Sequence, residues 1–199
     1  MLVAVTVCCV LAWLSSQTRL AMRQQHAVEQ IRQLGGHASY AHQLEGLPPP
    51  MPPAFLRRVT GNVVMSDVVK VSWHAVHVSD DDTRVLAELP QLNDLRLNST
   101  RLSDAAMEPL SQLTELRRLD LWCSQVTDQS MPYLSNLHRL RRLSLYSTQV
   151  TDEGLKFLEQ LHLLEELNLR GTNVTLDGVE WLQRKLPDCR ISGVKDWHP

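Results

Sequence analysis

The pair Leu-x-Leu occurs four times in this chain, at Leu95/Leu97, Leu119/Leu121, Leu143/Leu145 and Leu167/Leu169. The spacing is constant, because 119−95, 143−119 and 167−143 all equal 24. Two further apolar series keep the same interval: Leu102, Val126, Val150 and Val174, and then Leu110, Leu134, Leu158 and Leu182. A unit of this kind has too few apolar residues to bury a core of its own, so the copies must stack and cover one another. The period therefore predicts a solenoid.

The array extends by one step at each end. One interval before Leu95 lies Val71, in a degenerate copy, and one interval after Leu167 lies Ile191. We therefore expect a repeat domain over 68–193, with repeats at about 68–91, 92–115, 116–139, 140–163 and 164–187 and a closing strand near 190–193. Five repeats exceed the roughly three that such arrays need for stability.

The unit Leu-x-x-Leu-x-Leu-x-x-Thr-x-Val-Thr-Asp resembles the leucine-rich repeat. That resemblance implies an α/β solenoid with a curved parallel sheet on the concave side and short helices on the convex side, here preceded by an N-terminal helix. Where the family usually has Asn, this chain has Thr100, Ser124, Thr148 and Thr172. A hydroxyl at this position can still cap buried backbone groups between coils.

The Val-Thr-Asp sequence and the N-terminal region most resemble the short membrane-anchored leucine-rich-repeat proteins of planctomycete bacteria. The resemblance covers nearly the whole chain. It implies a fold and a membrane anchor, but it implies no assigned activity.

Charge and cysteine content narrow the possible partners and covalent links. The formal net charge of −2 argues against a dedicated nucleic-acid-binding protein, because phosphate contacts usually require a basic excess. Cys8 and Cys9 lie in an apolar run, whereas Cys123 and Cys189 belong to strands three repeats apart. Strands so separated lie roughly 14 Å apart, too far for a disulfide. We therefore expect free thiols and no nucleic-acid partner.

Residues 1–16 are expected to be an apolar membrane anchor. The run from Leu2 to Leu14 is apolar except for Thr6, but a spanning helix needs about 20 residues. We therefore expect the transmembrane helix to begin upstream of Met1, with the basic stretch that the planctomycete-type resemblance implies. The alternative is the core of a signal peptide, although no basic residue precedes it and no clear Ala-x-Ala site follows. Arginines after the anchor favour cytoplasmic repeats, and basic residues upstream would favour the opposite, so the side of the membrane stays open.

Three further segments separate this anchor from the repeats. Residues 17–36 are expected to form a juxtamembrane helix that ends at Gly35-Gly36 and packs an amphipathic face on the first coil. Residues 37–54 are expected to be a linker, because five prolines between Leu47 and Pro53 keep the chain extended; an SH3-type ligand is the alternative. Residues 55–67 offer apolar cover for the open end of the solenoid, and 194–199 form a tail.

No sequence motif of a known catalytic site is present. The chain has no Gly-rich phosphate loop, Gly-x-Ser-x-Gly, His-Glu-x-x-His or Cys-x-x-Cys, so we expect a non-enzymatic protein without a cofactor. His74-x-x-His77 could hold a metal, but odd spacing on a strand favours two surface histidines. The run Asp80-Asp81-Asp82 lacks the Gly and distal Glu of a calcium loop.

The repeated acid has a structural interpretation. Asp80 aligns with Asp104, Asp128 and Asp152, and we interpret these residues as N-caps of the short convex helices, together with Thr127 and Thr151. In the last copy Leu176 delays the acid to Asp177, which predicts a turn one residue longer.

Residues that alternate with the buried leucines should point to the concave face. They are Asp94, Arg96, Asn98, Arg118, Asp120, Trp122, Arg142, Ser144, Tyr146, Glu166, Asn168 and Arg170. Two aromatic residues at equivalent positions beside arginines have the composition of an interface hot spot; the alternative is a solvated face with incidental aromatics. The predicted partner-binding residues are Arg96, Arg118, Asp120, Trp122, Arg142, Tyr146 and Arg170.

The sequence thus predicts a membrane-tethered protein–protein interaction module. Its partner is expected to carry an acidic patch, since the middle repeats are rich in arginine: Arg117, Arg118, Arg139, Arg141 and Arg142. The alternative is a substrate-recognition adaptor analogous to the F-box proteins of ubiquitin ligases. No F-box precedes these repeats, so that alternative depends on analogy alone.

Overall fold

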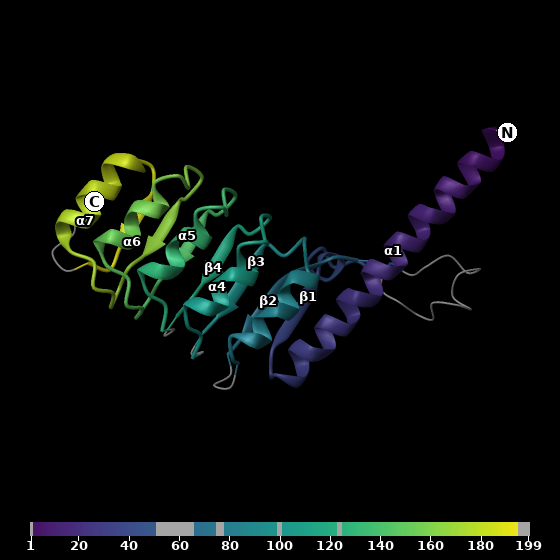
Figure 1. The fold of residues 1–199 in the computed structure, drawn as a ribbon, viewed down its shortest axis with the longest axis horizontal. Helices are drawn as coiled ribbons and strands as arrows, with labels where there is room; N and C mark the ends of the chain where they lie inside the picture. Colours follow the sequence, from purple (N-terminus) through teal and green to yellow (C-terminus); the bar gives the residue numbers. More distant parts are fainter. Residues whose placement is uncertain (1, 51–65, 75–77, 99–100, 123–124, 195–199) are drawn as a thin grey trace.

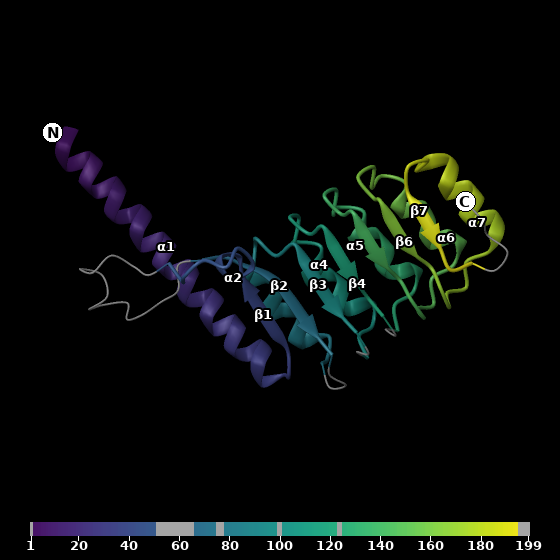
Figure 2. The same ribbon diagram turned by 180° about the vertical axis from the view of Figure 1, so that it is seen from behind.

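The computed structural model describes residues 2–50, 66–74, 78–98, 101–122 and 125–194. Seven strands form one sheet in chain order, with short helices along one face (Figures 1 and 2). The strands are β1 (His37–Tyr40), β2 (Val68–Trp73), β3 (Asp94–Leu97), β4 (Arg118–Asp120), β5 (Arg142–Ser144), β6 (Glu166–Asn168) and β7 (Arg190–Ser192). The helices are α1 (Leu2–Gln33), α2 (Ala41–Leu44), η1 (Asp81–Glu88), η2 (Asp104–Ala106), α4 (Met107–Leu110), η3 (Asp128–Ser130), α5 (Met131–Leu134), α6 (Asp152–Leu155), η4 (Lys156–Leu158) and α7 (Leu176–Lys185).

The strand register reproduces the sequence period. From β2 to β7 all neighbours are parallel, and Val71 pairs with Leu95, which pairs with Leu119, and so on to Leu167 and Ile191. These side chains form one column in the core, each at most 2% exposed. The α/β solenoid expected from the repeat is confirmed.

The convex turns are joined by a repeated hydrogen-bond ladder. In each turn a carboxylate accepts two bonds from the Ser or Thr that begins the next helix, one from its backbone N–H and one from its hydroxyl. For Asp128 the acceptor distances to Thr151 N and Oγ1 are 2.8 and 2.6 Å. The same pair of bonds joins Asp80 to Ser103, Asp104 to Thr127 and Asp152 to Thr175. Every one of these turns is thereby tied to the following one.

This ladder corrects the role expected for the aspartates. The side chains that accept helix N–H groups are Ser103, Thr127, Thr151 and Thr175, so the threonine part of the N-cap prediction is confirmed. The aspartate part is wrong, because each carboxylate bonds to the next coil instead of its own helix. In the last coil Thr175 accepts from Gly178, one residue further on than in the coils before it. The longer turn expected there is wrong, because α7 begins directly after Thr175 just as α6 begins directly after Thr151.

The hydroxyls in the usual Asn position also act within one coil. Thr148 and Thr172 donate to the carbonyls of Leu145 and Leu169, three residues earlier, at 2.8 and 2.7 Å. The expectation of a cap between coils is therefore wrong at these two positions. Thr100 and Ser124 lie outside the described residues.

The N-terminal end of the solenoid is covered by α1 and by an added strand. Ala27, Val28 and Ile31 of α1 are buried and belong to the same core as the repeats. Strand β1 pairs antiparallel with β2, although its residues were expected to begin a linker. Between α1 and β1 the chain passes very close to Trp73: a Cβ added at Gly36 would lie 2.4 Å from the indole nitrogen. Of the segment 55–67 that was expected to act as the cap, residues 55–65 lie outside the described residues.

The structure does not support the membrane anchor expected for residues 1–16. Residues 2–33 form a single helix that extends away from the repeats at its N-terminal end (Figures 1 and 2). Across the part of the chain that the structure describes, no helix is long and apolar enough to span a membrane. The predicted membrane-anchored location is therefore wrong.

Candidate functional site

The concave face presents three rows of side chains, because residues one repeat apart occupy equivalent positions on neighbouring strands. The first row is Lys70, Asp94, Arg118, Arg142, Glu166 and Arg190. The second row is Ser72, Arg96, Asp120, Ser144, Asn168 and Ser192. The third row follows the strands and contains His74, Asn98, Trp122, Tyr146 and Arg170.

A groove of about 710 Å³ runs along this face, and all seven residues predicted to bind a partner line it. The other lining residues are Asn98, Leu143, Ser144, Glu166, Leu167, Asn168, Arg190 and Ser192. Arg190 and Ser192 were missed by sequence reasoning because they belong to the closing strand. A further step of one repeat from Glu166 and Asn168 would have found them.

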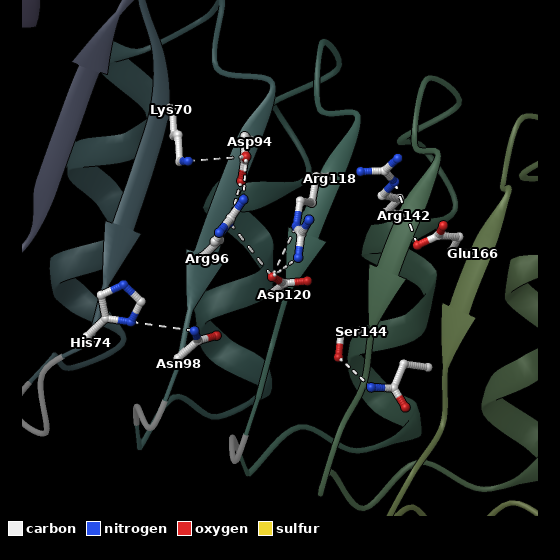
Figure 3. A network of polar contacts seen from close by, with 11 residues as sticks. Lys70, His74, Asp94, Arg96, Asn98, Arg118, Asp120, Arg142, Ser144 and Glu166 are labelled. Atoms are coloured by element: carbon white, nitrogen blue, oxygen red, sulfur yellow. Dashed lines mark hydrogen bonds and ion pairs between the residues drawn. The ribbon is translucent and has the colours of Figure 1, made fainter. Parts of the chain in front are cut away.

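The charged residues of the first two rows form ion pairs with one another (Figure 3). The guanidinium of Arg96 donates two bonds to the carboxylate of Asp94, at 3.0 and 3.1 Å, and these bonds raise the pKa of Arg96. Arg118 contacts Asp120 at 3.0 Å. Glu166 is shared between Arg142 at 3.7 Å and Arg190 at 2.8 Å.

The arginines of the middle repeats are therefore mostly not free to bind a partner's charges. Off the groove, Arg139 and Arg141 also form ion pairs, with Glu115 and Glu165 of neighbouring coils. Most of the positive charge that the sequence suggested is therefore already matched inside the protein. The groove still has five arginines against two carboxylates, so its balance is positive.

Arg170 differs from the other arginines in the groove. Its side chain is exposed, and within the described part of the chain it forms no ion pair or side-chain hydrogen bond. Its backbone is held at both ends: the N–H donates to Asn168 Oδ1 at 3.1 Å, and the carbonyl accepts from the N–H of Ser147 at 2.9 Å. The backbone position is thus fixed while the guanidinium stays available.

Trp122 and Tyr146 contact each other in the third row. Their ring centroids are 5.2 Å apart and the rings are nearly perpendicular, at 78°. This edge-to-face arrangement is a favoured one for aromatic pairs. Trp122 nevertheless remains 42% exposed, so the pair leaves apolar surface open to the groove.

Two pairs of polar side chains lie on the same face as the aromatic pair. Asn168 Nδ2 donates to Ser144 Oγ at 3.4 Å, and Asn98 Nδ2 lies 3.5 Å from His74 Nδ1 (Figure 3). Both contacts are at the long limit of hydrogen-bond geometry. These amides and hydroxyls can exchange their present partners for groups of a ligand at little cost.

The other candidates from the sequence are placed by the structure only in part. No group of three His, Cys, Asp or Glu within the described ranges could hold a metal, and His77 lies outside them. Asp82 accepts from the N–H and hydroxyl of Ser79, and Asp81 pairs with Arg84, so the acidic run acts in local bonds. Burial, and to a smaller extent Glu166, raises the pKa of the free Cys189 thiol to about 12, which disfavours the reactive thiolate. Cys123 lies outside the described residues.

A second pair of aromatic residues lies on the convex side and was not singled out by sequence reasoning. Tyr133 of α5 and Phe157 of η4 are also one repeat apart, and they are 38% and 40% exposed. The same periodic comparison that located Trp122 and Tyr146 would have found them. They provide a matched set of aromatic residues on the opposite face.

Comparison with known proteins supports the fold. Residues 160–182 match the family model described as Leucine Rich repeat. No curated protein sequence matches the chain. Among solved structures, the leucine-rich-repeat ectodomain of the receptor kinase SOBIR1 from Arabidopsis thaliana is 20% identical with a TM-score of 0.50, and the match covers 80% of this chain and 79% of that one.

Two bacterial structures match over shorter stretches. An internalin from Listeria monocytogenes is 26% identical, with a TM-score of 0.48, over 58% of this chain and 31% of its own length. A leucine-rich-repeat protein from Leptospira interrogans is 25% identical, with a TM-score of 0.45, over 55% of this chain and 27% of its own length. The present chain thus spans about a third or less of these two proteins.

Proposed function

We propose that the concave groove of this leucine-rich-repeat solenoid binds a protein partner, with Trp122 and Tyr146 at the centre of the contact. Leucine-rich-repeat domains are in general non-enzymatic interaction modules. The observation that carries the proposal is the edge-to-face aromatic pair, which stays partly exposed just beyond the ends of β4 and β5. Aromatic residues in such a setting are the usual energetic centre of a protein interface.

The charges of the groove favour a partner with an acidic surface. Five arginines line the groove against two carboxylates, and a complementary potential accelerates association more than it strengthens the final complex. Since Arg96, Arg118 and Arg142 are paired inside the protein, we expect their contribution to be modest. The aromatic pair then supplies most of the binding energy.

The decisive experiment compares two aromatic double variants. A display library of genomic fragments from the encoding organism is panned against the full chain, against Trp122→Ala with Tyr146→Ala, and against Tyr133→Ala with Phe157→Ala. Each double variant removes two aromatic residues one repeat apart, from opposite faces. Circular dichroism of all three proteins verifies that they fold.

We expect fragments retained by the wild type and the convex variant to be lost from the concave variant. Two truncated anchors at an interface centre weaken binding by about 2 kcal/mol or more, which is roughly 30-fold. A groove variant that retains the fragments at wild-type strength would contradict the proposal. So would a library from which the wild type retains nothing.

A further inference from the structure

Arg170 is the arginine of the groove whose guanidinium is available to bind a carboxylate of a ligand. Arg96, Arg118, Arg142 and Arg190 each contact a carboxylate of this chain. An incoming carboxylate would have to compete with those contacts. Arg170 has no such contact among the described residues, so a bond to its guanidinium would add to the existing pairs without breaking one. Guanidinium–carboxylate bonds are among the stronger ones in proteins.

The distance from Arg170 to the aromatic pair suits an extended peptide. Trp122, Tyr146 and Arg170 occupy the same row on three successive coils, and neighbouring strands lie about 4.8 Å apart. The midpoint of the aromatic pair is therefore one and a half strand spacings from Arg170, roughly 7 Å. In an extended chain, side chains on the same face lie about 6.8 Å apart, at positions i and i+2. One apolar side chain over the pair thus places the side chain two positions away beside Arg170.

The second row offers bonds to the backbone of such a segment. Ser144 and Asn168 lie next to the path from Tyr146 to Arg170, and their mutual bond of 3.4 Å is long enough to be replaced. Both line the same groove as the aromatic pair. A segment that crosses the strands here can therefore satisfy some of its polar backbone groups without entering the ion pairs of the first row.

We propose that the groove recognises an extended segment with an Asp or Glu two positions from an apolar residue, in which the Trp122–Tyr146 pair holds the apolar side chain and Arg170 binds the carboxylate. This inference rests on the proposed function, since it places the determinants of specificity within the same groove. The recognised element is short and linear. The paired arginines serve mainly to hold the face in shape and contribute little to selectivity.

The test begins with a random peptide library panned against the full chain. We expect enrichment of peptides that have Trp, Phe, Leu or Met with Asp or Glu two positions to either side. A synthetic peptide from this set, labelled for fluorescence anisotropy, is then compared with its analogue in which the acid is replaced by the matching amide. The acidic peptide should bind at least about tenfold more tightly, the value of one charged hydrogen bond.

Substitutions of two arginines then compare the available guanidinium of Arg170 with a paired one in their effect on the preference for acid over amide. Arg170→Ala should abolish the preference for acid over amide, while Arg142→Ala, which removes a guanidinium already bound to Glu166, should change it by less than about threefold. Arg170→Glu should reverse the preference, so that a peptide with Lys in place of the acid binds more tightly than the original. This reversal cannot result from a general loss of stability, because one variant gains a ligand.

Other outcomes contradict the peptide motif, linear recognition as such, or both proposals. If selected peptides are lost with Trp122→Ala and Tyr146→Ala but show no acid preference, or keep it in Arg170→Ala, the peptide motif is wrong and the proposed function stands. If no peptide is enriched, linear recognition is wrong, and the panning of genomic fragments decides the proposed function separately. If enriched peptides bind the concave double variant as they bind the wild type, both proposals fail.

Discussion

The two faces of the solenoid use the same repeat period in opposite ways. On the convex side one arrangement recurs: Asp80, Asp104, Asp128 and Asp152 each bond to the Ser or Thr of the next turn with nearly the same distances. On the concave side the positions recur while the residues change, as in the third row with Asn98, Trp122, Tyr146 and Arg170. A side chain that is the same in every repeat serves the stacking of coils. A side chain that varies at a repeated position is free to serve recognition.

Both faces depend on the leucine core between them, and its disruption should have the largest effect. Leu145 is fully buried in a central coil, so Leu145→Ala should lower the free energy of unfolding by about 2–5 kcal/mol. Leu163→Ala, at a site that is 50% exposed, is the matched control and should cost far less. Thermal and denaturant melts followed by circular dichroism measure both, and equal losses would show that burial does not rank these leucines.

The convex ladder should come next in effect. Asp128→Ala removes a carboxylate that accepts two hydrogen bonds from Thr151, and we expect a loss of about 1.5–3 kcal/mol in the free energy of unfolding. Asp128→Asn keeps an acceptor oxygen and should lose less.

Asp177→Ala is the control for the ladder, because Asp177 makes no bond to a following coil among the described residues. It should cost at most about 1 kcal/mol, the value of an acid in the first turn of a helix. Denaturant melts rank the three variants. If Asp128→Ala were no more damaging than Asp177→Ala, the ladder would have little part in stability.

A substitution in the turn that follows β5 should have a smaller effect, and it should raise stability instead of lowering it. Ser147 has a left-handed backbone with φ of 54°, and the equivalent Gly171 has φ of 74°. The left-handed conformation costs a non-glycine residue about 1–2 kcal/mol in the folded state. Glycine avoids this cost, but it loses more conformational entropy on folding, which cancels part of the gain. Ser147→Gly should therefore raise stability by about 0.5–1 kcal/mol. A lowered melting temperature would mean that the Ser147 side chain contributes more than its backbone strain costs.

The recognition face should show the smallest effect on folding. Trp122→Ala and Tyr146→Ala each replace a partly exposed residue, and such changes usually alter stability by about 0.5 kcal/mol. A double-mutant cycle measures the coupling of the two rings, expected at no more than about 1 kcal/mol for an edge-to-face pair in contact with water. Unfolding of the double variant would place these side chains in the core and remove the contrast between the faces.

The sequence supported accurate predictions for the buried core positions of the repeat and for its helix caps. Leu119 and Leu143 are buried in register, and Thr151 caps its helix, as expected. The prediction for Asp128 was wrong because in sequence it stands in the first turn of a helix, where an acid is commonly a cap. The amide that it binds belongs to the next coil and comes near only when the coils stack.

The same limit applies to the N-terminal part of the chain, which has no repeat to guide an alignment. Strand β1 ends at Tyr40, but its partner β2 begins only at Val68, and nothing in the short sequence of β1 distinguishes it from a linker. The packing of Gly36 against Trp73 is likewise a contact between segments far apart in the sequence. Composition alone suggested a membrane anchor, whereas the helix that contains those residues is not apolar enough along its length to span a membrane.

Sequence periodicity by itself determined the solenoid, the strand register and the set of side chains that line the concave groove, since a stacked repeat converts a fixed interval into a fixed position. Only the tertiary structure decided which of those side chains are already engaged. Arg118 and Arg142 are as basic in the sequence as Arg170, but Asp120 lies beside the first and Glu166 beside the second, while Arg170 has no carboxylate in reach within the described residues. The physical reason is that charge pairing depends on distances of a few ångströms between side chains of the same strand or of neighbouring strands, and a one-dimensional period does not contain those distances.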